Sequence, residues 1–240
     1  MCRFAAPHHI AFLRAFCLYG VIQNALEEPP VTTATTPIAR SKTAALTRAL
    51  DSVPKGYTRY TCGTVSSSKA HALAQKFHRL YGIGCTPAQR VTRRKKGIAS
   101  ALLVMYWPEQ AEQVEWLLLA THGAGLEGET LQDVTDRPRL TWLGYELYRR
   151  TEHGRTAWSW RRPKKEMEEH FAMIAELRNK RHDRALASYL QMLANQPGFH
   201  GVREQSWRLL EDARKRGHEG ELPFLFHVQK TPHGERMHLE

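Results

Sequence analysis

The sequence predicts an α+β fold, with a mostly antiparallel sheet in its first part and a helical C-terminal half. Two observations lead to this prediction: short alternating or continuous apolar segments fill the middle of the chain, and apolar residues at helical spacing fill its last third. The 240 residues, 42% of them hydrophobic, are sufficient for a buried core. We predict an N-terminal segment and linker (1–40), a basic α/β sheet domain (41–162) and a helical region with a terminal strand or hairpin (163–240).

The first 40 residues are predicted to form a helix and then an exposed connector. Residues 1–26 are apolar and free of acids, but His8, His9 and Arg14 interrupt any signal-peptide core. We therefore expect a helix that docks on the body, with a transit peptide as the alternative. Residues 27–40 are rich in Pro and Thr, which is typical of a connector.

The next elements predict a sheet with a helix on it. Alternation over 57–65 indicates a strand, and the serines that follow can cap a helix that ends at Gly82. Residues 98–107 and 114–121 then predict two apolar strands joined by a short acidic loop. This order of strand, helix, strand and strand is similar to the first part of a ferredoxin-like or RRM-like sheet. The Gly-rich, acidic residues 122–138 predict a surface loop.

The remaining elements are a hairpin and helices. Residues 140–150 and 156–162 flank a turn and predict a β-hairpin, with Gly154 in the left-handed conformation. Apolar spacing then predicts helical structure from Pro163 to Pro197 and a second helix over 202–216. The last segment, 224–230, is predicted to be a strand.

The positive charge of the protein is concentrated in one third of the chain. The formal net charge is +11, from 35 Lys and Arg against 24 Asp and Glu. Residues 29–108 hold 13 of the cations and a single acid, Asp51, which leaves 22 cations and 23 acids elsewhere. A localised positive field attracts polyanions, above all the phosphates of nucleic acid.

The densest run of cations is QRVTRRKKG, residues 89–97, which we predict to be a loop between a helix and a strand. Closely spaced cations on a loop can reach adjacent phosphates, and such contacts give affinity without base preference. A solvated loop without a specific ligand is the alternative. The candidate nucleic-acid-binding residues of this run are Arg90, Arg93, Arg94, Lys95 and Lys96.

A second cationic cluster surrounds two tryptophans of the predicted hairpin. An arginine and an aromatic ring can hold an unstacked base while other cations hold the backbone. Because Trp158 and Trp160 would share one face of a strand, their burial in the core is the alternative. The candidate binding residues here are Arg149, Arg150, Arg155, Trp158, Trp160, Arg161, Arg162, Lys164 and Lys165.

Two weaker signals complete the set of candidate phosphate contacts. Lys69 follows a serine cluster at the start of the first predicted helix, and Lys76 lies further along it. Helix capping is the ordinary role of such serines. Residues 198–201 have the GxxG spacing of a KH-domain loop, but an ordinary turn also explains these two glycines.

We find no motif for a cofactor, a metal ion or a catalytic group. The 13 histidines show no paired-ligand spacing. The cysteines, Cys2, Cys17, Cys62 and Cys85, are scattered, which is typical of reduced thiols, so we expect a cytoplasmic protein. No segment reaches the run of roughly 18 apolar residues that spans a bilayer, so we expect no membrane partner.

Three functions remain open. The first is a non-enzymatic protein that grips the phosphate backbone of DNA or RNA through the basic loop and the hairpin. The second is a metal-independent endonuclease, for which His71, His78, His153 and His200 are the candidate groups. The third is a subunit of a nucleoprotein assembly whose basic surface meets an acidic protein partner and whose helical C-terminal half makes the protein contact.

Overall fold

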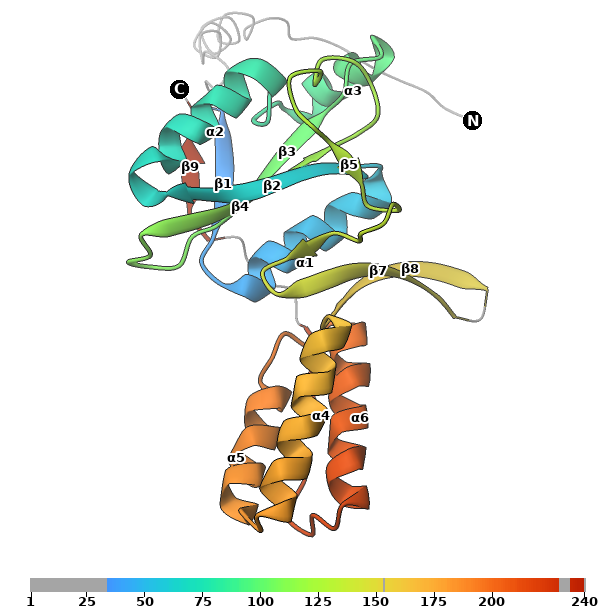
Figure 1. Cartoon of the computed structure of the whole chain (residues 1–240). Helices are drawn as coiled ribbons and strands as arrows, with labels where there is room; N and C mark the ends of the chain where they lie inside the picture. The colour runs from blue at the N-terminus through green and yellow to red at the C-terminus, as the bar shows by residue number, and fades with distance from the viewer. Residues whose placement is uncertain (1–33, 153, 229–233, 240) are drawn as a thin grey trace, which may run out of the picture. The chain divides into compact units, whose positions relative to one another are not determined.

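The computed structural model describes residues 34–152, 154–228 and 234–239, and these have the predicted α+β fold (Figure 1). The strands are β1 (Thr35–Ala39), β2 (Arg59–Ser66), β3 (Ala101–Tyr106), β4 (Gln113–Ala120), β5 (Gln132–Asp133), β6 (Thr141–Trp142), β7 (Tyr145–Glu152), β8 (Arg155–Arg161) and β9 (Arg236–His238). The helices are α1 (Lys42–Ser52), α2 (Ser67–Tyr81), α3 (Pro87–Lys95), α4 (Lys164–Asn179), α5 (Asp183–Ala194) and α6 (His200–Lys215). The predicted N-terminal helix lies outside the described residues.

The larger sheet has six strands in the order β5-β2-β4-β3-β1-β9. Its centre confirms the predicted topology, because β4 lies between β2 and β3 and pairs antiparallel with both. The predicted helix between these strands is α2, and Gly82 ends it with a φ of 65°. The predicted surface loop contributes the short strand β5 at the edge next to β2.

The prediction of an exposed connector over residues 27–40 is wrong for its last part, which forms strand β1. The structure places Thr35–Ala39 beside β3, with Ile38 opposite Met105 in a parallel pair. Ile38 and Ala39 are buried, so this segment belongs to the core and not to an exposed linker. A Pro- and Thr-rich segment can form a strand when its backbone pairs on both sides, and here β9 supplies the second side.

Helices α1 and α2 cover opposite faces of this sheet (Figure 1). Along β3, Leu102 packs in the cluster that contains α1, and its neighbour Leu103 packs in the cluster that contains α2. This alternation follows from strand geometry, in which successive side chains point to opposite faces. Both faces are therefore buried.

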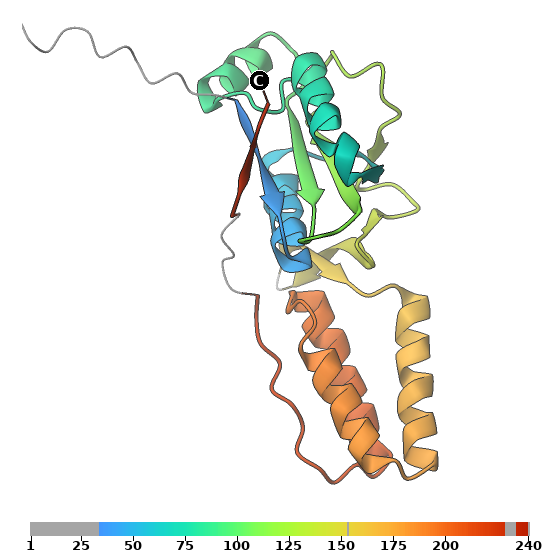
Figure 2. The ribbon, with the colours of Figure 1, turned by 90° about the vertical axis from the view of Figure 1, so that its left-hand side faces the viewer.

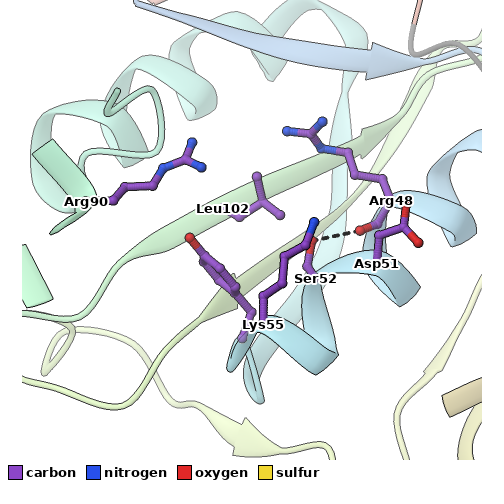
Figure 3. Close-up of a pocket in the computed structure, with 7 residues that line it drawn as sticks. Arg48, Asp51, Ser52, Lys55, Arg90 and Leu102 are labelled. Atoms are coloured by element: carbon purple, nitrogen blue, oxygen red, sulfur yellow. Dashed lines mark hydrogen bonds between the residues drawn. The ribbon is translucent and has the colours of Figure 1, made fainter. Parts of the chain in front are cut away.

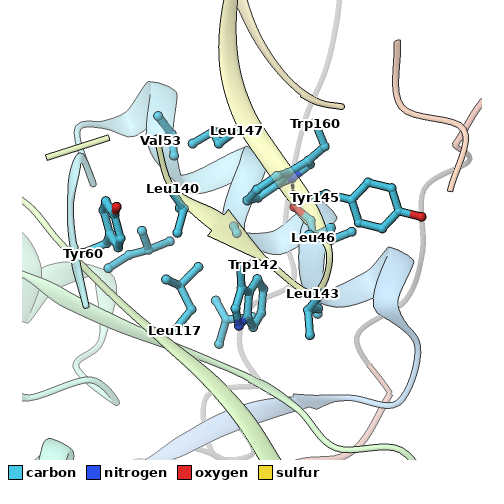
Figure 4. Packing of buried hydrophobic residues seen from close by; sticks show 14 of the residues in the cluster. Leu46, Val53, Tyr60, Leu117, Leu140, Trp142, Leu143, Tyr145, Leu147 and Trp160 are labelled. Carbon is cyan, nitrogen blue, oxygen red and sulfur yellow. Dashed lines mark hydrogen bonds between the residues drawn. The ribbon is translucent and has the colours of Figure 1, made fainter. Parts of the chain in front are cut away.

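The three-stranded sheet β6-β7-β8 packs on the α1 side (Figure 4). Trp160 of β8 and Leu147 of β7 are opposite each other and fully buried. The indole nitrogen of Trp160 donates a 2.9 Å hydrogen bond to the carbonyl oxygen of Leu46 in α1. The predicted hairpin is confirmed, and Gly154 in its turn has a φ of +73°.

Helices α4, α5 and α6 form the helical C-terminal part around a cluster that includes Ile174, Leu190 and Leu209. The predicted strand over 224–230 is wrong for its described residues, which have no regular structure through Val228. The chain instead returns to the larger sheet, where β9 pairs antiparallel with β1 (Figure 2). No helix in the described ranges is long and apolar enough to cross a bilayer.

Candidate nucleic-acid interface

The basic run at residues 89–97 is mostly the helix α3, so its prediction as a loop is wrong. Thr86 caps the helix: its hydroxyl accepts from Gln89 N, and the Gln89 side chain accepts from Thr86 N. Pro87 occupies the first helical turn, where its missing N–H costs nothing. Cations at the other end of α3 complement the partial negative charge of a helix C-terminus.

Three of the five cations in this run are exposed to solvent, two in α3 and one at its C-cap. None of the α3 residues is buried, so packing alone does not account for its composition. Arg94, Lys95 and Lys96 are exposed, and within the described part of the chain no carboxylate forms an ion pair with them. Arg93 has a structural role, because its Nε and Nη2 donate hydrogen bonds of 3.2 and 2.9 Å to Ala99 O.

Arg90, one turn before Arg94 in α3, lines a pocket of about 190 Å³ (Figure 3). The pocket also receives residues from the end of α1 and the 3₁₀ turn Val53–Lys55. Burial, and then the nearby Arg90 and Arg236, lower the pKa of Arg48 to about 10. The lining residues are Arg48, Asp51, Ser52, Lys55, Tyr57, Arg90 and Leu102.

Helix α2 places its cations apart from this pocket. Lys69 and Lys76 are exposed on α2, which covers the opposite face of the sheet from α1. The helix has 15 residues, or roughly 22 Å at about 1.5 Å per residue. Because α3 follows the C-terminal end of α2, Lys69 in the first turn is far from it (Figure 1).

Only some of the candidate binding residues in the second cationic cluster are exposed. Arg149 and Arg155 are exposed, and Arg149 lies opposite the half-buried Trp158. Arg150 is half-buried and contacts His200, with 3.0 Å between its Nη1 and the imidazole Nε2. Lys165 is exposed, whereas Lys164 pairs with Glu168 at 3.4 Å.

Three other hairpin candidates have structural roles. Trp160 and Arg162 are fully buried, so neither can contact a nucleic acid. Their prediction as binding residues is therefore wrong. Arg161 is half-buried and pairs with Glu146 at 3.3 Å. Its guanidinium also lies 4.9 Å from the centre of the Tyr148 ring. Burial of Trp160 is the alternative that strand alternation had left open. The large apolar ring of a tryptophan is commonly buried in a core.

Close packing explains the two glycines of the GxxG segment. A Cβ on Gly198 would lie 2.0 Å from the carbonyl oxygen of Phe226, and one on Gly201 would lie 2.7 Å from that of Trp160. Gly198 and Phe199 precede α6, and Gly201 is buried in its first turn. This packing favours the ordinary turn over the KH-like loop as the reason for both glycines.

We expect Gly201→Ala to lower the free energy of unfolding by about 1 to 3 kcal/mol, because the added methyl meets backbone that cannot move easily. Urea denaturation monitored by circular dichroism measures this change. Gly128→Ala is the comparison, since a Cβ there would make only an ordinary contact, 3.5 Å from the Tyr81 hydroxyl oxygen. A loss for Gly201→Ala no larger than for Gly128→Ala would contradict the packing argument.

The histidines proposed for an endonuclease do not form one group among the described residues. His71 Nε2 lies 3.0 Å from the His238 carbonyl oxygen, and His78 accepts a hydrogen bond from Gly84 N. Both belong to α2, whereas His200 begins α6. His153 lies outside the described residues. The described ranges contain no group of three His, Cys, Asp or Glu placed to hold a metal ion.

Arg48 and Lys55 line the pocket but are not among the site residues predicted from the sequence. Both belong to the cationic segment, but the helix that carries Arg48 was not predicted. Ser41 offered a signal, because it is a capping residue just before an Ala- and Leu-rich segment. Comparison with protein-family models, curated proteins and solved structures finds no match for this chain.

Proposed function

We propose that this protein binds DNA or RNA through its phosphates, with the exposed cations of α3 as the principal contacts. The observation that carries the proposal is the set Arg94, Lys95 and Lys96, which is exposed and without an ion pair in the described ranges. Their segment also lacks acids in the sequence, so no carboxylate adjacent in the chain reduces the local field. Cations that are not neutralised bind polyanions by displacing condensed counterions.

The geometry of α3 suits backbone contact better than base recognition. Its N-terminus is fixed by the Thr86 cap and its C-terminal turn by Arg93, so the free side chains extend from a defined helix. Long, flexible cationic side chains contact phosphates of any sequence. Arg149 and Arg155 of the hairpin are additional exposed contacts. We therefore expect binding with little base preference.

A non-enzymatic function in the cytoplasm fits the same features. The two described cysteines, Cys62 and Cys85, are free thiols, which supports a reducing environment. A protein contact through the C-terminal helices remains part of the proposal for a nucleoprotein assembly. The exposed apolar side chains in this part of the chain include Trp207 and Phe224, which are 54% and 71% exposed.

Fluorescence anisotropy with labelled single- and double-stranded DNA and RNA tests the proposal. We expect binding at low salt, with affinities that differ little between unrelated sequences of one polymer type. Gel analysis of the same mixtures should show intact strands with and without magnesium. Absence of binding to all four polymers at low salt would overturn the proposal, and cleavage without magnesium would favour the endonuclease.

A further inference from the structure

The pocket beside α3 gathers three cations around a small space (Figure 3). Arg48 and Arg90 approach it from opposite sides of Leu102, and the side chain of Lys55 enters from a third direction. Asp51 is the one carboxylate in the lining. The formal charge of the lining is therefore +2, and the two arginines come from segments about 40 residues apart in the sequence.

The two arginines carry buried hydrogen-bond donors without partners. The Nε atoms of Arg48 and of Arg90 are both inaccessible to solvent and have no acceptor among the described residues. Such a donor costs free energy, because it has lost its water without gaining a partner. The Ser52 hydroxyl does not help, since it donates to the Arg48 carbonyl oxygen at 2.8 Å.

Electrostatics also favour the binding of an anion in this pocket. The pKa of Arg48 is lowered by burial and by the like charges of Arg90 and Arg236, yet at about 10 it keeps the guanidinium protonated at neutral pH. No ion pair with a carboxylate compensates either arginine in the described ranges. An oxyanion in the pocket would relieve this repulsion and accept from the guanidinium groups.

The size and the charge of the pocket suit a small anion with nearly two negative charges. Its volume of about 190 Å³ is below the roughly 300 Å³ at which drug-sized ligand pockets begin, so it suits one small group better than a whole nucleotide. A phosphate monoester carries about −1.5 to −2 charges at neutral pH, which matches the lining better than the single charge of an internal phosphodiester.

We propose that this pocket binds a phosphate monoester, and that its source is the terminal phosphate of a nucleic-acid strand. The second part rests on the proposed function. Arg94 follows Arg90 by four residues, so both lie along one side of α3. A strand whose terminal phosphate is held by Arg48 and Arg90 can then continue along the exposed cations of the helix. The protein would thus distinguish strand ends from strand interiors.

Competition experiments with short oligonucleotides test this proposal. The probes are one sequence with a 5′-phosphate, a 3′-phosphate or hydroxyls at both ends, and inorganic phosphate is tested separately by thermal denaturation. We expect one phosphorylated end to bind roughly tenfold more tightly than the hydroxyl form, because charge-assisted hydrogen bonds are involved. Inorganic phosphate should raise the melting temperature more than an equal ionic strength of chloride.

Variants connect these effects to the pocket. Arg48→Gln should abolish both the end preference and the stabilisation by phosphate. Lys55→Gln should weaken both. Because Lys55 is exposed, this variant should fold normally, so its loss of binding can be assigned to the pocket. Lys42→Gln, at the other end of α1 and outside the pocket lining, should preserve both.

The outcomes separate this proposal from the proposed function. Equal affinity for phosphorylated and hydroxyl ends, with no effect of inorganic phosphate, would overturn the pocket assignment even if nucleic acid binds. Stabilisation by inorganic phosphate without an end preference would overturn the strand-end assignment and favour a free phosphate ligand. Stabilisation by phosphate in a protein that binds no nucleic acid would overturn the proposed function and leave a phosphate pocket.

Discussion

Replacement of the buried Arg162 by methionine is expected to lower the free energy of unfolding by about 3 to 4 kcal/mol. Arg162 is 0% exposed and joins the end of β8 to α5 and α6. Its Nε donates to Gln196 Oε1 at 2.6 Å, and its Nη2 donates to Ser206 Oγ at 2.8 Å. The guanidinium also donates to the carbonyl oxygens of Leu193 and Val202.

Methionine would fill much of the volume but would remove all of these hydrogen bonds, and only Leu193 O would keep a second side-chain donor, the hydroxyl of Ser206 at 3.4 Å. Part of the cost is offset, because burial of the cation is itself unfavourable and lowers the pKa of Arg162. Urea denaturation measures the change from the shift of the midpoint at a constant slope. We expect two-state unfolding in both proteins.

The adjacent Arg161 offers a matched control. It is half-buried and pairs with Glu146, which keeps a second partner in Arg139 at 3.0 Å. We therefore expect Arg161→Met to cost no more than about 1 kcal/mol. Equal losses for Arg161→Met and Arg162→Met would contradict a special role for the buried guanidinium.

Reversal of two charges on α3, Arg94→Glu with Lys95→Glu, is expected to weaken nucleic-acid binding at least roughly 30-fold at about 0.15 M salt. At that salt, counterion release makes each phosphate contact worth roughly a fivefold gain in binding affinity. Repulsion between the new carboxylates and the phosphates adds to the loss. The loss should be similar for unrelated sequences, because phosphate contacts carry no base information. Arg93 is left unchanged because it holds the helix end through Ala99 O.

The control for this variant carries the same change in net charge elsewhere. Arg184→Glu with Lys215→Glu also replaces two exposed cations, and Lys215 ends α6 as Lys95 ends α3. We expect less than about a threefold loss, because long-range charge is screened over roughly 8 Å at physiological salt. Circular dichroism should show both variants folded. Similar losses of affinity in the two variants would show that binding follows net charge alone, and would contradict the assignment of the interface to α3.

The sequence predicts the centre of the fold because its signals there are local. Period-two alternation in β2, the amphipathic stripe of α2 and the apolar residues of β3 each indicate an element without its partners. Strand β1 was missed because its Pro and Thr residues resemble a connector, and only pairing with β3 and β9 makes it part of a sheet. Strand β9 has three residues, which is too short for a periodic signal.

The candidate site was predicted in composition but not in geometry. The cations of α3 were identified, yet the helix was not, because it has no apolar stripe and only the Thr86 and Gln89 cap marks it. Trp160 and Arg162 illustrate a second limit: alternation shows which residues share a face, but the packing of α1 and α6 decides which face is buried. The pocket depends on Arg48 and Arg90, which only the tertiary fold brings together.

The salt dependence of binding to duplex DNA, measured for the wild type and for the Arg94→Glu, Lys95→Glu variant, tests the central claim most directly. The logarithm of the affinity should fall linearly with the logarithm of the salt concentration, by about 0.9 for each phosphate contact. If both α3 cations contact phosphates, the slope of the variant should be smaller in magnitude by about two. Equal slopes for the two proteins would contradict a phosphate interface on α3.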